Sequence, residues 1–106
     1  MSTSKSSSNL NPKQRRHLKG LGHHLNAIVT VGKDGISDTV VSALEEALLQ
    51  HELVKVRVGN SSELDRHEVA EELATRSKSS LTSVLGKTIL LYKAHPDKPV
   101  IKLPKK

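Results

Sequence analysis

A loop bounded by two glycines, Gly32-Lys33-Asp34-Gly35, has the residue types and spacing that could bind a phosphate group. It follows a short β-branched run and precedes a segment that we expect to be helical. Glycines let a backbone approach a ligand closely and adopt positive φ. Free N–H groups and the dipole at a helix start favour an anion, and Lys33 adds a positive charge at the loop tip. The loop is therefore predicted to contact phosphate, although the same spacing also occurs in ordinary turns.

Basic residues on either side of this loop could extend such a site. A first helix is predicted from about Pro12 to about Leu25, because Asn11 suits an N-cap and proline suits the first helical position. Its apolar side would be Leu18, Leu21 and Leu25. A strand predicted over residues 53–58 places basic side chains on one face and valines on the other. The candidate contacts are Lys13, Arg15, Arg16 and Lys19 on the helix and Lys55 and Arg57 on the strand.

The other chemically suggestive residues favour neither catalysis nor metal binding. Gly86-Lys87-Thr88 resembles the end of a phosphate-binding P-loop, but that pattern requires a glycine where Leu81 stands, so we interpret it as a hairpin turn. The six histidines form no helical His-x-x-x-His pair, and cysteine is absent. No nucleophile elbow is present. We expect no catalytic residues, no metal site, no cofactor and no enzymatic activity.

The charge is distributed in blocks along the 106 residues, which carry a formal net charge of +6. Residues 1–37 contain six basic residues and one acidic residue, and residues 77–106 contain seven and one. Residues 38–76 contain four basic and nine acidic residues. Blocks of one sign create a local field that concentrates a polyanion, whereas a merely basic tail would be solvated. Tyr92 is the only aromatic residue, so stacking bases on several rings is excluded, and a nucleic acid would be held by its backbone or shape.

The chain is predicted to form one domain over residues 11–104, preceded by a disordered Ser-rich segment, residues 1–10, and followed by a basic tail, residues 105–106. No run of 18 apolar residues indicates a membrane span, and the N-terminal segment has no apolar core typical of a secretory signal. Without cysteines, a cytoplasmic location is expected.

The order of predicted elements is α-β-α-β-α-β-β, which gives an α/β fold, a two-layer sandwich on a mixed four-stranded sheet. Further helices are expected at about 38–50, capped by Ser37, and from a cap at Ser62 to about Arg76. The remaining strands are expected at 27–31, 81–85 and 88–93, with a short edge segment at 100–103. Helices would cover one face of the sheet, and the other face would be open to water.

Four separated segments together resemble the YhbY family, the stand-alone form of the CRM (chloroplast RNA splicing and ribosome maturation) domain. They run in the same order as in that family, over about residues 11–104, and are Pro12–Leu25, Val31–Gly35, His51–Arg57 and Val84–Tyr92. The resemblance implies a fold similar to the C-terminal domain of translation initiation factor three. It also implies RNA contact by the Gly-x-x-Gly loop, carried over to Gly32, Lys33, Asp34 and Gly35, and by the basic first helix.

The expected function is a monomeric RNA-binding factor that associates with precursors of the large ribosomal subunit and assists their assembly. This expectation combines the family resemblance with the cationic blocks. Plant relatives with several such domains promote intron splicing, so an intron-splicing factor is one alternative. A protein-interaction adaptor on the ribosome, using the acidic helices, is another.

Overall fold

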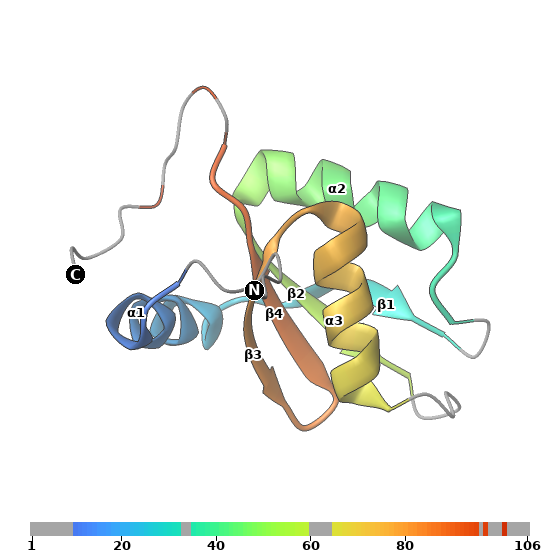
Figure 1. The fold of residues 1–106 in the computed structure, drawn as a ribbon, viewed down its shortest axis with the longest axis horizontal. Helices are drawn as coiled ribbons and strands as arrows, with labels where there is room; N and C mark the ends of the chain where they lie inside the picture. Colours follow the sequence, from blue (N-terminus) through green and yellow to red (C-terminus); the bar gives the residue numbers. More distant parts are fainter. Residues whose placement is uncertain (1–9, 33–34, 60–64, 96, 98–100, 102–106) are drawn as a thin grey trace, which may run out of the picture.

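The computed structural model describes residues 10–32, 35–59, 65–95, 97 and 101. Three helices and four strands occur in the expected order within these residues (Figure 1). Their bounds are α1 (Pro12–Gly22), β1 (Ala27–Val31), α2 (Asp38–His51), β2 (Leu53–Val58), α3 (Arg66–Ser77), β3 (Ser80–Leu85) and β4 (Thr88–Tyr92). The α/β class and the order of elements are confirmed. The predicted disorder of residues 1–9 and the basic tail lie outside the described residues.

The sheet is mixed, with the strand order β1-β2-β4-β3. β1 and β2 are parallel, whereas β4 is antiparallel to both of its neighbours, β2 and β3. β3 and β4 form the predicted hairpin, and Gly86 in its turn has a φ of 59°, as a turn beginning with glycine requires. β1 is an edge strand in which only Val29 and Val31 are buried, so it is less buried than its β-branched sequence suggested.

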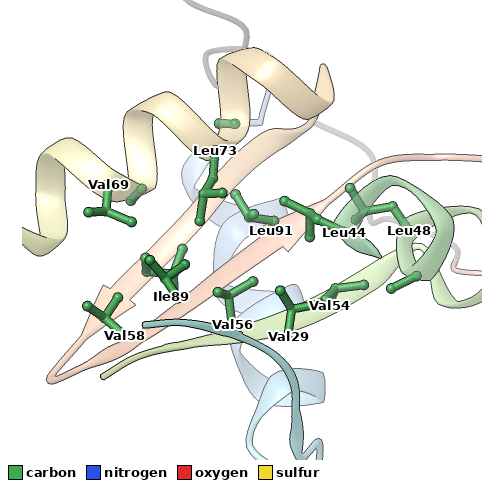
Figure 2. Packing of buried hydrophobic residues seen from close by; sticks show 14 residues of the cluster. Val29, Leu44, Leu48, Val54, Val56, Val58, Val69, Leu73, Ile89 and Leu91 are labelled. Atoms are coloured by element: carbon green, nitrogen blue, oxygen red, sulfur yellow. The ribbon is translucent and has the colours of Figure 1, made fainter. Parts of the chain in front are cut away.

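The main core lies between the sheet and the pair α2 and α3 (Figure 2). The alternation of β2 places Val54, Val56 and Val58 in this core, as predicted. Leu44 and Leu48 of α2 are among the residues that pack there, and so are side chains of α3 and β4: Val69, Leu73, Ile89 and Leu91. Each fully buried aliphatic side chain contributes roughly 1.5–3 kcal/mol of hydrophobic stabilisation, so this layer supplies most of the stability of the fold.

α1 covers part of the opposite face of the sheet, which the sequence had indicated would be open. Leu18 is completely buried in a second cluster that also contains Leu53 and Leu90. These strand residues point away from the main core, so their apolar surface requires a separate cover. Leu10, which the sequence assigned to the Ser-rich segment, is also buried in this cluster, together with Tyr92. The helices therefore lie on both faces, and only the remainder of the second face is available to a ligand.

α1 is shorter than predicted, and fewer of its apolar side chains are buried than the sequence indicated. A reciprocal cap joins Asn11 and Gln14: the Gln14 N–H donates to Asn11 Oδ1 at 2.8 Å, and the Asn11 N–H donates to Gln14 Oε1 at 3.2 Å. The helix ends at Gly22 instead of Leu25. Leu21 and Leu25 were expected to pack, but they are 39% and 36% exposed. Only Leu18 and Gly22, one turn apart, are buried against the sheet.

The N-cap of α2 is the residue that the sequence predicted, whereas the N-cap of α3 is a different residue. Ser37 caps α2, and its Oγ accepts a hydrogen bond from the Val40 N–H at 3.2 Å. α3 begins at Arg66 with Asp65 as its N-cap, and Asp65 Oδ1 accepts from the His67 N–H at 2.7 Å. The expected cap at Ser62 lies outside the described residues. Asp65 takes the role because its short carboxylate reaches the first free N–H groups of the helix directly.

Glu52 anchors the C-terminal segment to the end of α2. This residue is 2% exposed and has a φ of 64°. Its two carboxylate oxygens accept hydrogen bonds from the backbone N–H groups of His95 and Ile101, both at 2.7 Å. Burial raises the pKa of Tyr92, and the nearby charge of Glu52 raises it further. Ile101 is the part of the predicted edge segment 100–103 that the structure describes, and it forms a bend.

Candidate nucleic-acid interface

The basic residues of α1 occupy two different environments. Lys13, Arg16 and Lys19 are exposed and recur every three residues, so they form a ridge on the solvent side of the helix. Arg15 lies three residues before Leu18 and is only half-exposed. Within the described part of the chain, its buried Nε has no hydrogen-bond partner. The ridge is therefore available to an external polyanion, whereas Arg15 lies partly against the protein.

The basic residues of β2 lie on the sheet face that α1 partly covers. Lys55 is half-buried, with Leu90 of β4 opposite it, and Arg57 is exposed, with Thr88 opposite it. Two residues along a strand are about 6.6 Å apart. On the other side, Arg57 is opposite Thr30 of β1. We use the name cationic face for the surface formed by these side chains and the ridge: Lys13, Arg16, Lys19, Lys55 and Arg57.

A pocket of about 110 Å³ joins the two parts of the cationic face, because Lys19 and Lys55 both line it. Its other lining residues come from the end of α1 and from the β3–β4 hairpin: Gly22, His23, Ser83, Leu85, Thr88 and Leu90. The structure thus brings together two lysines that are 36 positions apart in the sequence. Ser83 and Thr88 were not predicted as site residues, because only strand pairing places the hairpin next to β2. His23, the C-cap of α1, was not predicted either; its position four residues after Lys19 is the signal that could have indicated it.

The Gly-x-x-Gly loop lies where β1 leads into α2. Gly32 is exposed, and the Gly35 N–H donates to the Gly32 carbonyl at 3.0 Å, which closes a tight turn. Gly35 has a φ of 78°, a conformation that other residues rarely adopt. Lys33 and Asp34 lie outside the described residues. Of the loop's two glycines, Gly35 has a positive φ and Gly32 does not, and Gly35 leads through Ile36 and the N-cap Ser37 into α2.

Two other turns meet the sheet at the same end as this loop. The Gly59 N–H donates to the Val31 carbonyl at 2.8 Å, which joins the end of β2 to the end of β1. The Val58 N–H donates to the carbonyl of Lys87, also at 2.8 Å, so the hairpin turn lies beside them. Lys87 is exposed there, as the sequence indicated. Its place near the loop was not predicted, because nothing local in the sequence sets the order of the strands.

The predicted residues do not form one compact site. α1 lies at one side of the molecule, and the connection from β1 to α2 lies at the other (Figure 1). Arg57 lies between them, opposite Thr30 and one position before the end of its strand. A ligand that contacted both α1 and the Gly-x-x-Gly loop would have to cross the sheet along β2, as an extended polymer can.

The acidic residues of α2 and α3 lie on the other side of the sheet. Neither α1 nor any of the four strands contains an aspartate or glutamate. α2 and α3, which cover the opposite face, have acidic side chains that are exposed or half-buried: Asp38, Glu45, Glu46, Glu68, Glu71 and Glu72. Arg76 of α3 pairs with Glu72 at 3.5 Å. Lys55 and Arg57 come from the same stretch of sequence, residues 38–76, as these carboxylates, so the fold separates side chains of opposite sign that the sequence places close together.

The described ranges, 10–32, 35–59 and 65–95 with residues 97 and 101, contain no cluster of three or more histidine, aspartate or glutamate side chains that could hold a metal ion. In the same part of the chain, no helix is long and apolar enough to cross a membrane.

Comparison with known proteins assigns the chain to a domain family and finds relatives over most of its length. Residues 10–93 match the CRS1/YhbY (CRM) domain family. The chain is 42% identical over 95 residues to "Probable RNA-binding protein YqeI" of Bacillus subtilis, covering 90% of this chain and 99% of that protein. It is 33% identical over 97 residues to "RNA-binding protein" of Haemophilus influenzae, covering 92% and 97% of the two chains.

A solved structure shares the fold. The solution structure of a hypothetical protein from Staphylococcus aureus superposes with a TM-score of 0.77 at 34% identity, covering 90% of this chain and 99% of that one. The match over residues 10–93, the sequence relatives and this structure agree, and the chain belongs to the CRS1/YhbY (CRM) domain family. The predicted resemblance is confirmed.

Proposed function

We propose that the protein binds RNA through the cationic face. The observation that carries this proposal is the separation of charge: basic side chains of α1 and β2 share one face, and the acidic residues of α2 and α3 lie on the other. Such an arrangement attracts a polyanion to one side and repels it from the other. The names of the two sequence relatives, both described as RNA-binding, support RNA as that polyanion.

The proposed mechanism is capture of the RNA backbone. Lys13, Arg16 and Lys19 neutralise phosphates along the ridge, and Lys55 and Arg57 continue the contact across the sheet. The loop Gly32–Gly35 would hold a further phosphate at the start of α2, with Lys33 as its charge. Because the chain contains a single aromatic residue, recognition would depend on RNA shape instead of base stacking.

Two arginine substitutions test which face is used. Arg16→Glu and Arg66→Glu both reverse an exposed arginine in a helix and both change the net charge from +6 to +4. Arg16 is on α1, and Arg66 is the first residue of α3. In fluorescence anisotropy with a large-subunit ribosomal RNA fragment, Arg16→Glu should weaken binding about five- to tenfold, roughly 1–1.4 kcal/mol. Arg66→Glu should change it less than twofold. Equal losses would mean that net charge alone, and no particular face, determines binding.

We further propose that the RNA is ribosomal and belongs to a precursor of the large subunit, with the protein acting as a monomeric, non-enzymatic assembly factor in the cytoplasm. Support for this finer proposal comes from the family resemblance. In a sucrose gradient of a cell extract at low salt, the protein should sediment with large-subunit precursors. If the whole population stays at the top of the gradient, the assembly role is wrong even if RNA binding holds.

The acidic residues of α2 and α3 are a separate observation that supports an adaptor function. Exposed glutamates on two neighbouring helices, such as Glu45 and Glu68, could contact a basic ribosomal protein. This function predicts that Glu45→Lys removes the protein from the precursor fraction and leaves binding to naked RNA unimpaired. An intron-splicing factor would instead be recovered with intron RNA after crosslinking in cells.

A further inference from the structure

The pocket between α1 and the β3–β4 hairpin is built by a close contact. If Gly22 carried a Cβ, that atom would lie 2.7 Å from Leu90 Cδ2, so the missing side chain allows α1 to approach β4. In the sheet beneath, Leu90 lies between Lys55 of β2 and Ser83 of β3, which are its two pairing partners. Thr88 is two positions from Leu90 on the same strand and the same face. The floor of the pocket is thus an apolar residue with an ammonium group on one side and hydroxyl groups on the other.

The position of Ser83 depends on an irregularity in β3. The pairing between β3 and β4 shifts between Leu81 and Ser83, so that Leu81 faces Leu91 and Ser83 faces Leu90. A bulge of this kind redirects a side chain. Without the shift, Thr82 would be opposite Leu90; in the structure Thr82 is 3% exposed, whereas Ser83 lines the pocket.

The polar groups of this pocket are not engaged elsewhere in the described part of the chain. Lys19 and Lys55 form no ion pair, and the hydroxyls of Ser83 and Thr88 have no hydrogen-bond partner there. The pocket is partly open to solvent, and its volume of about 110 Å³ exceeds that of a single water molecule. It can therefore admit a small charged group that remains attached to a polymer.

Two lysines in a pocket whose described lining contains no carboxylate favour an anion such as a phosphodiester. A serine and a threonine hydroxyl can each donate and accept a hydrogen bond. The 2′-hydroxyl of ribose does the same, and it is the group by which a protein distinguishes RNA from DNA. Leu85 and Leu90 offer apolar contact to the sugar carbons.

We propose that this pocket binds one ribose-phosphate unit of RNA, with Lys19 and Lys55 on the phosphate and Ser83 and Thr88 on the 2′-hydroxyl. The protein therefore prefers RNA to DNA of the same sequence. This inference rests on the proposed RNA-binding function and adds the chemical basis of its selectivity.

The test compares Ser83→Ala/Thr88→Val with a control that removes the same two kinds of hydroxyl from α2 and α3, Ser42→Ala/Thr75→Val; both control residues are exposed. The probes are the ribosomal RNA fragment of the Arg16 experiment and DNA of the same sequence. Wild type and control should bind RNA about tenfold more tightly than DNA. The pocket variant should lose about three- to tenfold on RNA and be unchanged on DNA. Thermal melts of all three proteins, and the single substitutions, check that the fold is kept.

The outcomes separate this inference from the function on which it rests. If wild type binds the RNA but binds DNA equally well, or if the pocket variant keeps the RNA preference, the inference is overturned and RNA binding stands. An equal loss on RNA and DNA would also overturn it, because the hydroxyls would then act on a group that both polymers share. If wild type binds neither, the proposed function fails, and this inference fails with it.

Discussion

α1 contains two glycines, Gly20 and Gly22, which are about half a helical turn apart. Replacing them by alanine is expected to have opposite effects on the stability of the protein. Around Gly20 there is no atom within 4 Å of an added Cβ, whereas at Gly22 that Cβ would lie 2.7 Å from Leu90. Alanine is favoured over glycine in an open helical position because it loses less backbone entropy. In the packed position it crowds a side chain that is itself 5% exposed. Substitutions at these two positions therefore test how α1 packs on the sheet.

Gly20→Ala should raise the free energy of unfolding by about 0.5–1 kcal/mol. Gly22→Ala should lower it by about 1–3 kcal/mol, the usual cost of overpacking. Urea unfolding followed by circular dichroism measures both. If Gly22→Ala were as stable as Gly20→Ala, α1 would not lie on Leu90 as the structure describes.

Arg15 shows why site residues are harder to predict than elements. The sequence placed it with Lys13, Arg16 and Lys19, since all four are basic and close together. In the helix it lies three residues before Leu18 and therefore on the same side, and its Nε is buried without a partner within the described residues. Residue type indicated the charge correctly, but the extent of burial depends on where α1 packs, which no local pattern specifies.

At the scale of elements, the sequence correctly predicted those features of the helices and strands that depend on neighbouring residues in the chain. Asn11-Pro12 and Ser37 marked two helix starts, and the valines of β2 marked its buried face. It missed the end of α1 and the face that α1 covers, because Leu21 and Leu25 have the same spacing whether or not they are buried. The pocket of Lys19 and Lys55 was also beyond prediction, since it depends on strand order and on the shift in β3.

The Gly-x-x-Gly loop is a separate proposed contact, and it has a charge-matched test. Lys33→Glu and Lys78→Glu both change the net charge from +6 to +4. Lys78 is the exposed residue that ends α3. Lys33→Glu should weaken RNA binding by about 1–3 kcal/mol, because repulsion replaces a charge-assisted contact, and Lys78→Glu should have little effect. Anisotropy titrations measure the difference. Equal losses would indicate that the loop is only a turn and that RNA is bound elsewhere.

At the scale of the whole molecule, the fold brings basic residues of α1 and β2 together on one face and leaves the acidic residues of α2 and α3 on the other. The distribution of charge along the sequence did not require this, since Lys55 and Arg57 lie within the acidic stretch 38–76 and α1 could have packed beside the acidic helices. Because α1 lies on the other face, its basic ridge joins Lys55 and Arg57, and the acidic residues of α2 and α3 stay apart from them. The central claim is that this face binds the RNA backbone by neutralising phosphates.

The dependence of RNA affinity on salt tests that claim most directly. Each neutralised phosphate contributes a slope of roughly −0.7 on single strands to −0.9 on duplexes in a plot of log affinity against log salt. Four to six contacts from the cationic face and the loop give a slope of about −3 to −5. Titrations of the ribosomal RNA fragment between about 50 and 300 mM KCl should give that slope. This range includes the salt concentration of about 0.1 M at which the Debye length is about 10 Å. A flat titration would contradict the account, because it would mean that the protein does not hold RNA by its phosphates.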